Sequence, residues 1–230
     1  MGQATVNAVN AESDLQLVAS IEIGASLEKE LQEKKPDVLV DFTRHEAALT
    51  NIQTALKHHV ACVVGTTGFT ESDEDKIKGW CKESGTPVLL APNFAIGAVL
   101  LMKFASEAAK YFDWSEIIEL HHDKKIDAPS GTSLRTAKLM QQMAKKRFKE
   151  VSGEKVLQGA RGASVDGIKI HSVRLPGLIA HQEVLFGGLG ETLTLRHDSI
   201  SRESFMPGVI LSIRKIRTAS GLVIGLENFL

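Results

Sequence analysis

Two histidines and two lysines lie together near the middle of the chain, directly before a pattern that starts a helix. His121, His122, Lys124 and Lys125 follow a strand-like run, and residues 129–132 read Pro-Ser-Gly-Thr. Histidine titrates near neutral pH and lysine carries a positive charge, so this combination suits a small anionic substrate that must also receive a proton. We call residues 119–132 the central segment and treat it as the first candidate for an active site.

The start of the helix in the central segment is a candidate anion site. Ser130, Gly131 and Thr132 lie at its first positions, where backbone N–H groups are unpaired and the helix dipole is positive. Such groups favour a carboxylate or a phosphate. An ordinary helix cap is the competing interpretation. A serine nucleophile at Ser130 is not favoured, because no Gly-x-Ser-x-Gly turn surrounds it.

No metal site is expected in this chain. Adjacent residues of an extended segment point to opposite faces, so His121 and His122 would not bind one ion together. The chain has two cysteines, Cys62 and Cys81, and they are not clustered. This pattern argues against a disulfide framework or a zinc knuckle and indicates a reducing compartment. We expect a cytoplasmic protein, because no signal pattern or long uninterrupted apolar segment is present.

The overall charge points to a small-molecule partner. The 230 residues include 27 basic and 28 acidic side chains, so the formal net charge is −1. This balance gives no general attraction to nucleic acid or to a membrane surface. The length allows one large domain or two modest ones.

Alternating strand and helix patterns before the central segment predict an α/β fold with a Rossmann-like parallel sheet. The predicted strands cover residues 15–22, 38–42, 60–64 and 88–90, with helical patterns between them. Such an alternation implies right-handed crossovers, and ligands of these sheets bind beyond the carboxyl ends of the strands. The residues at those ends, our candidate cofactor-binding residues, are Glu22, Thr43, Gly65, Thr66, Thr67, Ala91, Pro92, Asn93 and Phe94.

The N-terminal residues lack the usual opening of a dinucleotide-binding fold. Residues 1–9 have a helical pattern, whereas that fold begins with a strand and a Gly-x-Gly-x-x-Gly turn. At most its final glycine is present, as Gly2. Either the start of the chain has been placed too late, or the protein lacks its first strand and most of its phosphate loop. Glu22 lies 20 residues after Gly2, where a carboxylate would accept hydrogen bonds from the ribose, although a surface glutamate is the alternative.

The later part of the chain predicts a second, α+β domain with a mixed sheet. A long helix at 95–111 leads into it, and strand-like runs at 168–175, 183–186 and 191–196 are separated by glycine-containing turns. A helix at 202–217 and a strand at 222–226 then return to the first domain. We therefore expect a dinucleotide-binding domain at residues 1–94 and 202–230, and a substrate-binding and oligomerisation domain at residues 95–201.

Several motifs resemble one known family. The run His-His-Asp-Lys-Lys-Ile-Asp-Ala-Pro-Ser-Gly-Thr at 121–132 resembles the signature of the 4-hydroxy-tetrahydrodipicolinate reductase family of lysine biosynthesis. Shorter matches are Val-Asp-Phe-Thr at 40–43, Val-Gly-Thr-Thr-Gly at 64–68, Ala-Pro-Asn-Phe at 91–94 and Ser-Arg-Glu-Ser-Phe at 201–205. The resemblance covers nearly the whole chain.

The resemblance implies reduction of a cyclic, unsaturated dicarboxylate by NADH or NADPH in the diaminopimelate route. At matching positions His121 is the implied acid/base and Lys125 the implied proton donor. His122 and Lys125, with the N–H groups of Gly131 and Thr132, are the implied ligands of the substrate carboxylates. A homotetramer assembled through the later sheet is also implied.

The same resemblance assigns the cofactor residues. Residues 65–68 and 91–94 would line the nicotinamide side of the cofactor, and the phosphate loop of the family directly precedes a Met-Gly pair like Met1-Gly2. The family often has an arginine after the acid that corresponds to Glu22, whereas this chain has Ile23. That difference favours NADH over NADPH.

Two other functions compete with this interpretation. One is a catalytically silent protein that binds a dicarboxylate or forms oligomers but lacks the pyrophosphate loop. The other is a different nicotinamide-dependent imine reductase or dehydrogenase.

Overall fold

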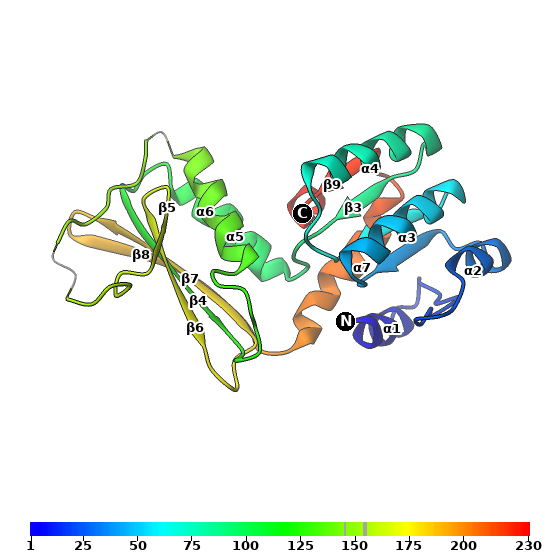
Figure 1. Cartoon of the computed structure of the whole chain (residues 1–230), viewed down its shortest axis with the longest axis horizontal. Helices are drawn as coiled ribbons and strands as arrows, with labels where there is room; N and C mark the ends of the chain where they lie inside the picture. Colours follow the sequence, from blue (N-terminus) through cyan, green and yellow to red (C-terminus); the bar gives the residue numbers. More distant parts are fainter. Residues whose placement is uncertain (145, 154–155) are drawn as a thin grey trace. The chain divides into compact units, whose positions relative to one another are not determined.

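The computed structural model describes residues 1–144, 146–153 and 156–230, and these residues form two compact units. Unit 1 comprises residues 1–96 and 202–230, and unit 2 comprises residues 97–201. Each unit has its own β-sheet (Figure 1). Within the described residues, every helix is too short or too polar to cross a lipid bilayer.

Unit 1 is built on a four-stranded parallel sheet in the order β1-β2-β3-β9. Its strands are β1 (Val38–Asp41), β2 (Ala61–Val64), β3 (Val88–Leu90) and β9 (Leu222–Ile224). Its helices are α1 (Gly2–Ala11), α2 (Leu27–Lys34), α3 (His45–Lys57), α4 (Glu71–Ser84) and α7 (Met206–Ile216). This alternation confirms the predicted Rossmann-like sheet.

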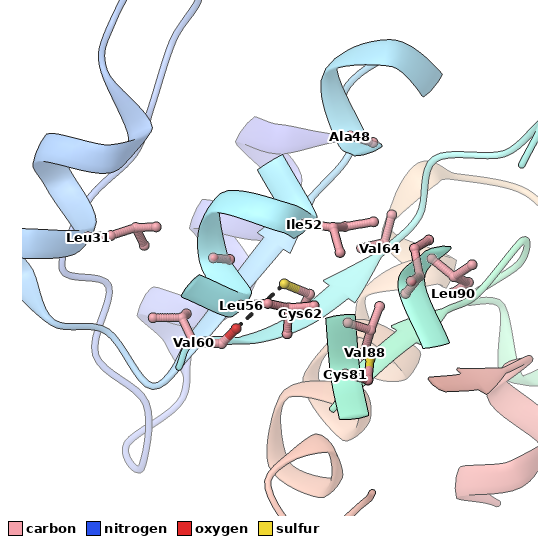
Figure 2. Packing of buried hydrophobic residues seen from close by; sticks show 12 residues of the cluster. Leu31, Ala48, Ile52, Leu56, Val60, Cys62, Val64, Cys81, Val88 and Leu90 are labelled. Carbon is pink, nitrogen blue, oxygen red and sulfur yellow. Dashed lines mark hydrogen bonds between the residues drawn. The ribbon is translucent and has the colours of Figure 1, made fainter. Parts of the chain in front are cut away.

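A buried apolar cluster joins the helices to one face of this sheet. Figure 2 shows Ile52 and Leu56 of α3 beside Cys62 and Val64 of β2, and none of the four is more than 2% exposed. Every residue of β2 is buried, as expected for a parallel strand covered on both sides. Burial raises the pKa of the Cys62 thiol well above its usual range. The packing thus fixes the strand ends at which the candidate cofactor residues lie.

Local signals in the sequence explain where α4 begins and ends. Thr70 and Asp73 form a capping box, in which each side chain accepts a hydrogen bond from the backbone of the other. Gly85 ends the helix in the left-handed conformation, at φ +68°, which glycine adopts without steric cost.

The strand predicted at residues 15–22 is wrong, because this segment is irregular. Its apolar side chains are partly exposed: Leu17 is 36%, Val18 38% and Ile21 37% accessible. A strand needs a neighbouring strand to pair its backbone groups. Within the described residues β1 is an edge strand that pairs with β2 alone, and no strand lies next to residues 15–22.

Unit 2 contains a five-stranded mixed sheet in the order β5-β6-β4-β7-β8. The β4–β6 pair is parallel and the other pairs are antiparallel, which confirms the predicted mixed sheet. Its strands are β4 (Trp114–His121), β5 (Ala163–Val165), β6 (Ile168–Arg174), β7 (Ala180–Gly188) and β8 (Glu191–Ser199), and its helices are α5 (Ile96–Ala108) and α6 (Gly131–Met143). Side chains of both helices and of the inner sheet face form the core of this unit, including Leu101, Ala105, Ile117, Ala137 and Met140.

The C-terminal prediction is partly wrong in its boundaries. Residues 202–217 do not form one helix, because a 3-10 turn, η1 (Arg202–Phe205), precedes α7. Pro207 lies in the first turn of α7. A backbone N–H in this turn would have no hydrogen-bond partner within the helix, so proline, which lacks the N–H, breaks no helical hydrogen bond here. The final strand is shorter than predicted, since a second 3-10 turn, η2 (Leu226–Phe229), follows β9.

Candidate active site

The central segment connects β4 to α6 as a strand, a loop and a helix. His121 is the last residue of β4, and Ser130 is the N-cap of α6. Between them the backbone N–H of Lys125 donates to the His122 carbonyl at 3.1 Å and closes a turn. The structure therefore has the predicted order of elements, and it places both histidines and Lys125 before the helix.

The imidazole of His121 is held by a buried carboxylate. Its Nδ1 lies within hydrogen-bonding distance of Oε2 of Glu119, and the Glu119 side chain is 0% exposed. Burial alone would raise the pKa of Glu119, but hydrogen bonds from His121 and Arg174 outweigh it and lower the pKa to about 2. Because an ionised Glu119 can only accept, it fixes the hydrogen of the neutral imidazole on Nδ1. Nε2 of His121 is then left for other chemistry.

Lys125 is paired with an acid of its own loop. Its Nζ donates to both carboxylate oxygens of Asp127, at 2.8 and 2.9 Å, and the Lys125 side chain is 22% exposed. The Lys125 hydrogen bond is the main cause of a lowered pKa at Asp127. Lys124 is exposed and His122 is half-buried. Lys125 is thus the lysine that the loop holds in a defined position.

The first turn of α6 has the properties of an anion site. The Ser130 hydroxyl accepts a hydrogen bond from the Ser133 backbone N–H at 3.2 Å, and the first turn contains no acidic residue. A side chain built at Gly131 would meet no atom within 4 Å, so this position faces open space. Backbone donors at Gly131 and Thr132 therefore lie where the helix dipole attracts a carboxylate.

A buried glutamine of β7 holds this helix start. Ser130 donates to the Ser133 hydroxyl at 2.9 Å, which donates to Oε1 of Gln182 at 2.8 Å. Nε2 of Gln182 in turn donates to Thr136 at 2.8 Å, and Thr136 donates to the Thr132 carbonyl at 2.8 Å. These hydrogen bonds attach the first turn of α6 to strand β7, in addition to the cap that Ser130 provides.

Three positioning side chains of this corner were missed by the sequence analysis. Glu119 shares a strand face with His121, two residues away, and a glutamate at an inward position of an apolar strand is the signal that could have identified it. Arg174 and Gln182 come from β6 and β7, which pair with β4. No local sequence pattern predicts these two residues, because strand pairing brings them to the central segment.

In unit 1 a buried aspartate joins the ends of the first two strands. Asp41 accepts hydrogen bonds from the Thr43 backbone N–H at 2.8 Å, the Thr43 hydroxyl at 2.7 Å and the Asn51 amide at 2.8 Å. The Thr66 hydroxyl lies 3.2 Å from the same carboxylate and 3.0 Å from the Thr43 carbonyl. Thr43 and Thr66, both candidate cofactor residues, therefore lie side by side.

Two aromatic rings pack beside Gly65 in the same corner. Phe42 and Phe94 meet edge to face, with ring centroids 5.6 Å apart, and a Cβ at Gly65 would lie 2.1 Å from the Phe42 ring. Residue 65 must therefore be a glycine, because a Cβ at this position would keep these loops from approaching each other. Asn93 accepts a hydrogen bond from the Ala95 N–H at 2.8 Å, while Thr67 and Pro92 are exposed.

The remaining candidate cofactor residues lie around α1 and in the irregular segment after it. Met1 is the N-cap of α1 without a side-chain cap, the first turn of α1 has no acid, and a side chain at Gly2 would meet nothing within 4 Å. Glu22 is exposed and does not end a strand, which corrects the predicted position of this carboxylate. The structure thus brings Thr43, Gly65 and Phe94 together. Glu22 lies in an irregular segment that pairs with no strand of the described residues.

Comparison with known proteins identifies the family. Residues 1–94 match the family model described as dihydrodipicolinate reductase, N-terminus, and residues 97–230 match the model of its C-terminus. The chain belongs to the dihydrodipicolinate reductase family. Relatives named 4-hydroxy-tetrahydrodipicolinate reductase include those of Nocardia farcinica, 51% identical over 235 residues, and Desulfitobacterium hafniense, 47% identical over 252 residues. Each alignment covers 100% of this chain and 94% of the relative.

Solved structures agree with this family assignment. The dipicolinate-bound dihydrodipicolinate reductase from Paenisporosarcina sp. TG-14 is 44% identical and matches with a TM-score of 0.89, covering 100% of this chain and 95% of that chain. A scyllo-inositol dehydrogenase from Lactobacillus casei, 8% identical with a TM-score of 0.62, shares the fold alone. The chain is therefore an oxidoreductase of the dihydrodipicolinate reductase family, and nothing in its similarities favours a silent binding protein or an unrelated dehydrogenase.

Proposed function

We propose that this chain reduces 4-hydroxy-tetrahydrodipicolinate to tetrahydrodipicolinate, with release of water, in the diaminopimelate route of lysine biosynthesis. The reaction consumes one NADH or NADPH and one proton for each water released. The observation that carries the proposal is the corner of unit 2, where a histidine and a lysine precede an open helix N-terminus. The dipicolinate named in the Paenisporosarcina structure is a ring with two carboxylates, and this corner has donors that suit such groups.

The first turn of α6 holds a carboxylate of the substrate. The N–H groups of Gly131 and Thr132 donate to it, and His122 and Lys125 add polar and positive groups on the loop side. Ser130 supports the turn as its cap. Binding at fixed donors orients the ring, and orientation supplies a large share of the lowering of the barrier.

Side chains of the central segment protonate the substrate. A nicotinamide cofactor, when bound, would supply a hydride to the conjugated imine, and the electron-rich product of that transfer would need a proton. Lys125, whose Nζ is hydrogen-bonded to Asp127, donates it, and His121 serves as the acid/base through Nε2. General acid catalysis contributes roughly 10²–10⁴-fold to such a step.

The carboxyl ends of the unit 1 strands would hold the cofactor. Thr43, Gly65 to Thr67 and Ala91 to Phe94 lie there, and the uncapped first turn of α1, with Met1 and Gly2, suits phosphate oxygens. We assign the preference to NADH, because Ile23 stands beside Glu22 where a cation would meet the extra phosphate of NADPH. Ile23 is fully exposed and brings no charge.

We propose a homotetramer assembled through the sheet of unit 2, as the resemblance to the reductase family implies. On β8 the side chains of Thr192, Thr194 and Arg196 are exposed and alternate with the partly buried Leu193 and Leu195. Sedimentation velocity tests this assembly directly, and a monomer at assay concentrations would contradict it.

Turnover tests the proposed reaction. Purified chain is mixed with NADH or NADPH and 4-hydroxy-tetrahydrodipicolinate, and loss of reduced cofactor is followed against simple imines as control substrates. We expect oxidation of the cofactor with the dicarboxylate and not with the simple imines. Calorimetric titration of both cofactors accompanies the assay, and the absence of binding of either would favour the silent alternative.

A further inference from the structure

Glu119 is the one acidic side chain in the described β4 strand that is completely buried. Its carboxylate accepts from Nδ1 of His121 and from two nitrogens of Arg174, Nη1 at 2.9 Å and Nη2 at 2.8 Å. A buried charge is costly unless it is paired and hydrogen-bonded, and here both conditions are met. An apolar residue would fill this part of the core at a lower cost in free energy. The glutamate at this position therefore indicates a role beyond packing.

Arg174 extends this pair to the loop that holds Lys125. While Nη2 of Arg174 contacts Glu119, the same nitrogen lies 2.6 Å from the backbone carbonyl of Asp127. The side chain of Asp127 in turn binds Lys125 through both oxygens. The planar guanidinium makes this geometry possible, because its donors are arranged in a rigid fork.

The register of β4 and β6 brings the arginine to this place. His121 and Arg174 are paired in the parallel ladder, and the Leu175 N–H donates to the His121 carbonyl at 3.1 Å. The backbone that presents the imidazole is therefore bonded to the backbone that presents the guanidinium. A slip of this register by one residue would place Arg174 on the face of the sheet opposite to His121.

We propose that Glu119 and Arg174 are positioning residues for the two proton-handling groups. Glu119 sets the tautomer and ring orientation of His121, and Arg174 ties the Asp127 carbonyl to the same carboxylate and so fixes the loop that carries Lys125. The Glu119–Arg174 ion pair thereby determines the distance between the imidazole and the ammonium. This inference rests on the roles proposed above for His121 and Lys125.

A similar trio on the opposite face of the same strand supplies a matched control. Glu116 accepts hydrogen bonds from Arg161 and, at 2.8 Å, from Nε2 of His171. Residues 116 and 119 point to opposite faces, and the Glu116 side chain is 34% exposed. Within the described residues Glu116 binds Arg161 and His171 and not His121, so its trio has the chemistry of the Glu119 trio without its place beside the proposed acid/base.

The experiment compares Glu119→Gln, Arg174→Lys and Glu116→Gln in the intact protein. Initial rates are measured over ranges of dicarboxylate and NADH, and thermal unfolding and sedimentation report fold and assembly. We expect kcat of the first two variants to fall tenfold to about a hundredfold, part of the roughly 10²–10⁴-fold available to general acid catalysis, while KM for NADH stays within about twofold. Glu116→Gln should keep kcat within about twofold of the unsubstituted protein, as is usual for a partly exposed pair.

A double variant separates positioning from simple stability. Glu119→Gln removes the counter-charge of Arg174, whose side chain is only 19% exposed, and this destabilises the protein. In Glu119→Gln/Arg174→Gln the charges balance again, so thermal stability should rise toward that of the unsubstituted protein while kcat stays low. Recovery of kcat together with stability would overturn the proposal and make the pair a purely structural one.

A mutant cycle with the histidine completes the test. If Glu119 acts through His121, adding Glu119→Gln to His121→Gln should lower kcat by less than about twofold further, far less than it does alone. Independent, multiplicative losses would overturn the positioning role. The proposals fail differently: no turnover by the unsubstituted protein would reject the proposed function, and a fully active His121→Gln would reject the role of His121. An impaired His121→Gln with a fully active Glu119→Gln would reject this inference alone.

Discussion

Glu119 of β4 and Gln182 of β7 are register partners in the antiparallel ladder, and both side chains are buried. Glu119 binds His121 and Arg174, whereas Gln182 binds Ser133 and Thr136 at the start of α6. Two neighbouring positions of one sheet therefore hold the proton-handling side and the anion-binding side of the site. The hydrogen-bond register of β4 and β7 sets the relative position of these two sides of the site. Loops alone would not fix that position.

Lys125→Ala is expected to reduce turnover without unfolding unit 2. The ammonium donates the proposed proton, so kcat should fall by about 10²-fold or more. Its pair with Asp127 is confined to the loop, so the free energy of unfolding should change by about 0.5 kcal/mol or less. Steady-state rates and urea unfolding measure both quantities. Lys124→Ala is the control, and a Lys125→Ala variant as fast as that control would reject the assignment.

His121→Gln is expected to lose far more activity than His181→Gln. His181 is bound to Asp198 at 2.7 Å and accepts a hydrogen bond from the Ile179 N–H, so it is already engaged within the sheet and its loop. We expect a fall in kcat of about 10²-fold or more for His121→Gln, and a change of about threefold or less for His181→Gln. Equal losses in the two variants would show that the histidine ranking is wrong.

Gly131→Pro removes one proposed backbone donor while keeping the helix. Proline is well tolerated at the first helical position, and Ser130 has the extended backbone, φ −65° and ψ 150°, that a residue before proline prefers. KM for the dicarboxylate should rise about tenfold, which corresponds to the loss of one charge-assisted hydrogen bond. Gly131→Ala keeps the N–H and faces open space, so its KM should stay near that of the unsubstituted protein. Identical KM values in the two variants would exclude an N–H contact at residue 131.

Ile23→Arg is expected to shift the cofactor preference toward NADPH. The substitution places a cation next to Glu22, where it can bind the 2′-phosphate, and the exposed position of Ile23 accommodates it. The ratio of kcat/KM for NADPH to that for NADH should rise about tenfold, a change that corresponds to about 1.4 kcal/mol. Ile23→Gln serves as the uncharged control. An unchanged ratio would remove the support for Glu22 as a ribose ligand.

Glu119 also predicts a pH dependence of stability. Folding lowers the pKa of this carboxyl group from its ordinary value of 4.5 to about 2. A lowered carboxyl pKa stabilises the folded state above the unfolded pKa, and that contribution is lost as the pH falls through the folded pKa. The free energy of unfolding should therefore decline between pH 4.5 and about pH 2. Urea unfolding at constant ionic strength should show a shallower decline for Glu119→Gln, and parallel curves would contradict the lowered pKa.

The parallel sheet and the central segment could be predicted from the sequence because their signals are local. The apolar runs of β1 to β3 are short and lie between helical patterns, and Ser130 to Thr132 is a recognisable helix start. Residues 15–22 show the limit of such signals, since an apolar run becomes a strand only beside a partner strand. Arg174 shows a second limit, because it reaches Glu119 across 55 residues through the pairing of β4 with β6.

The proposed mechanism requires that the amide end of α6 holds a dicarboxylate beside His121 and Lys125. A crystal structure of the chain with pyridine-2,6-dicarboxylate would show whether it does. We expect carboxylate oxygens at about 3 Å from the backbone nitrogens of Gly131 and Thr132, with the His121 and Lys125 side chains next to the ring. A dicarboxylate bound elsewhere, with the first turn of α6 free of it, would overturn the mechanism.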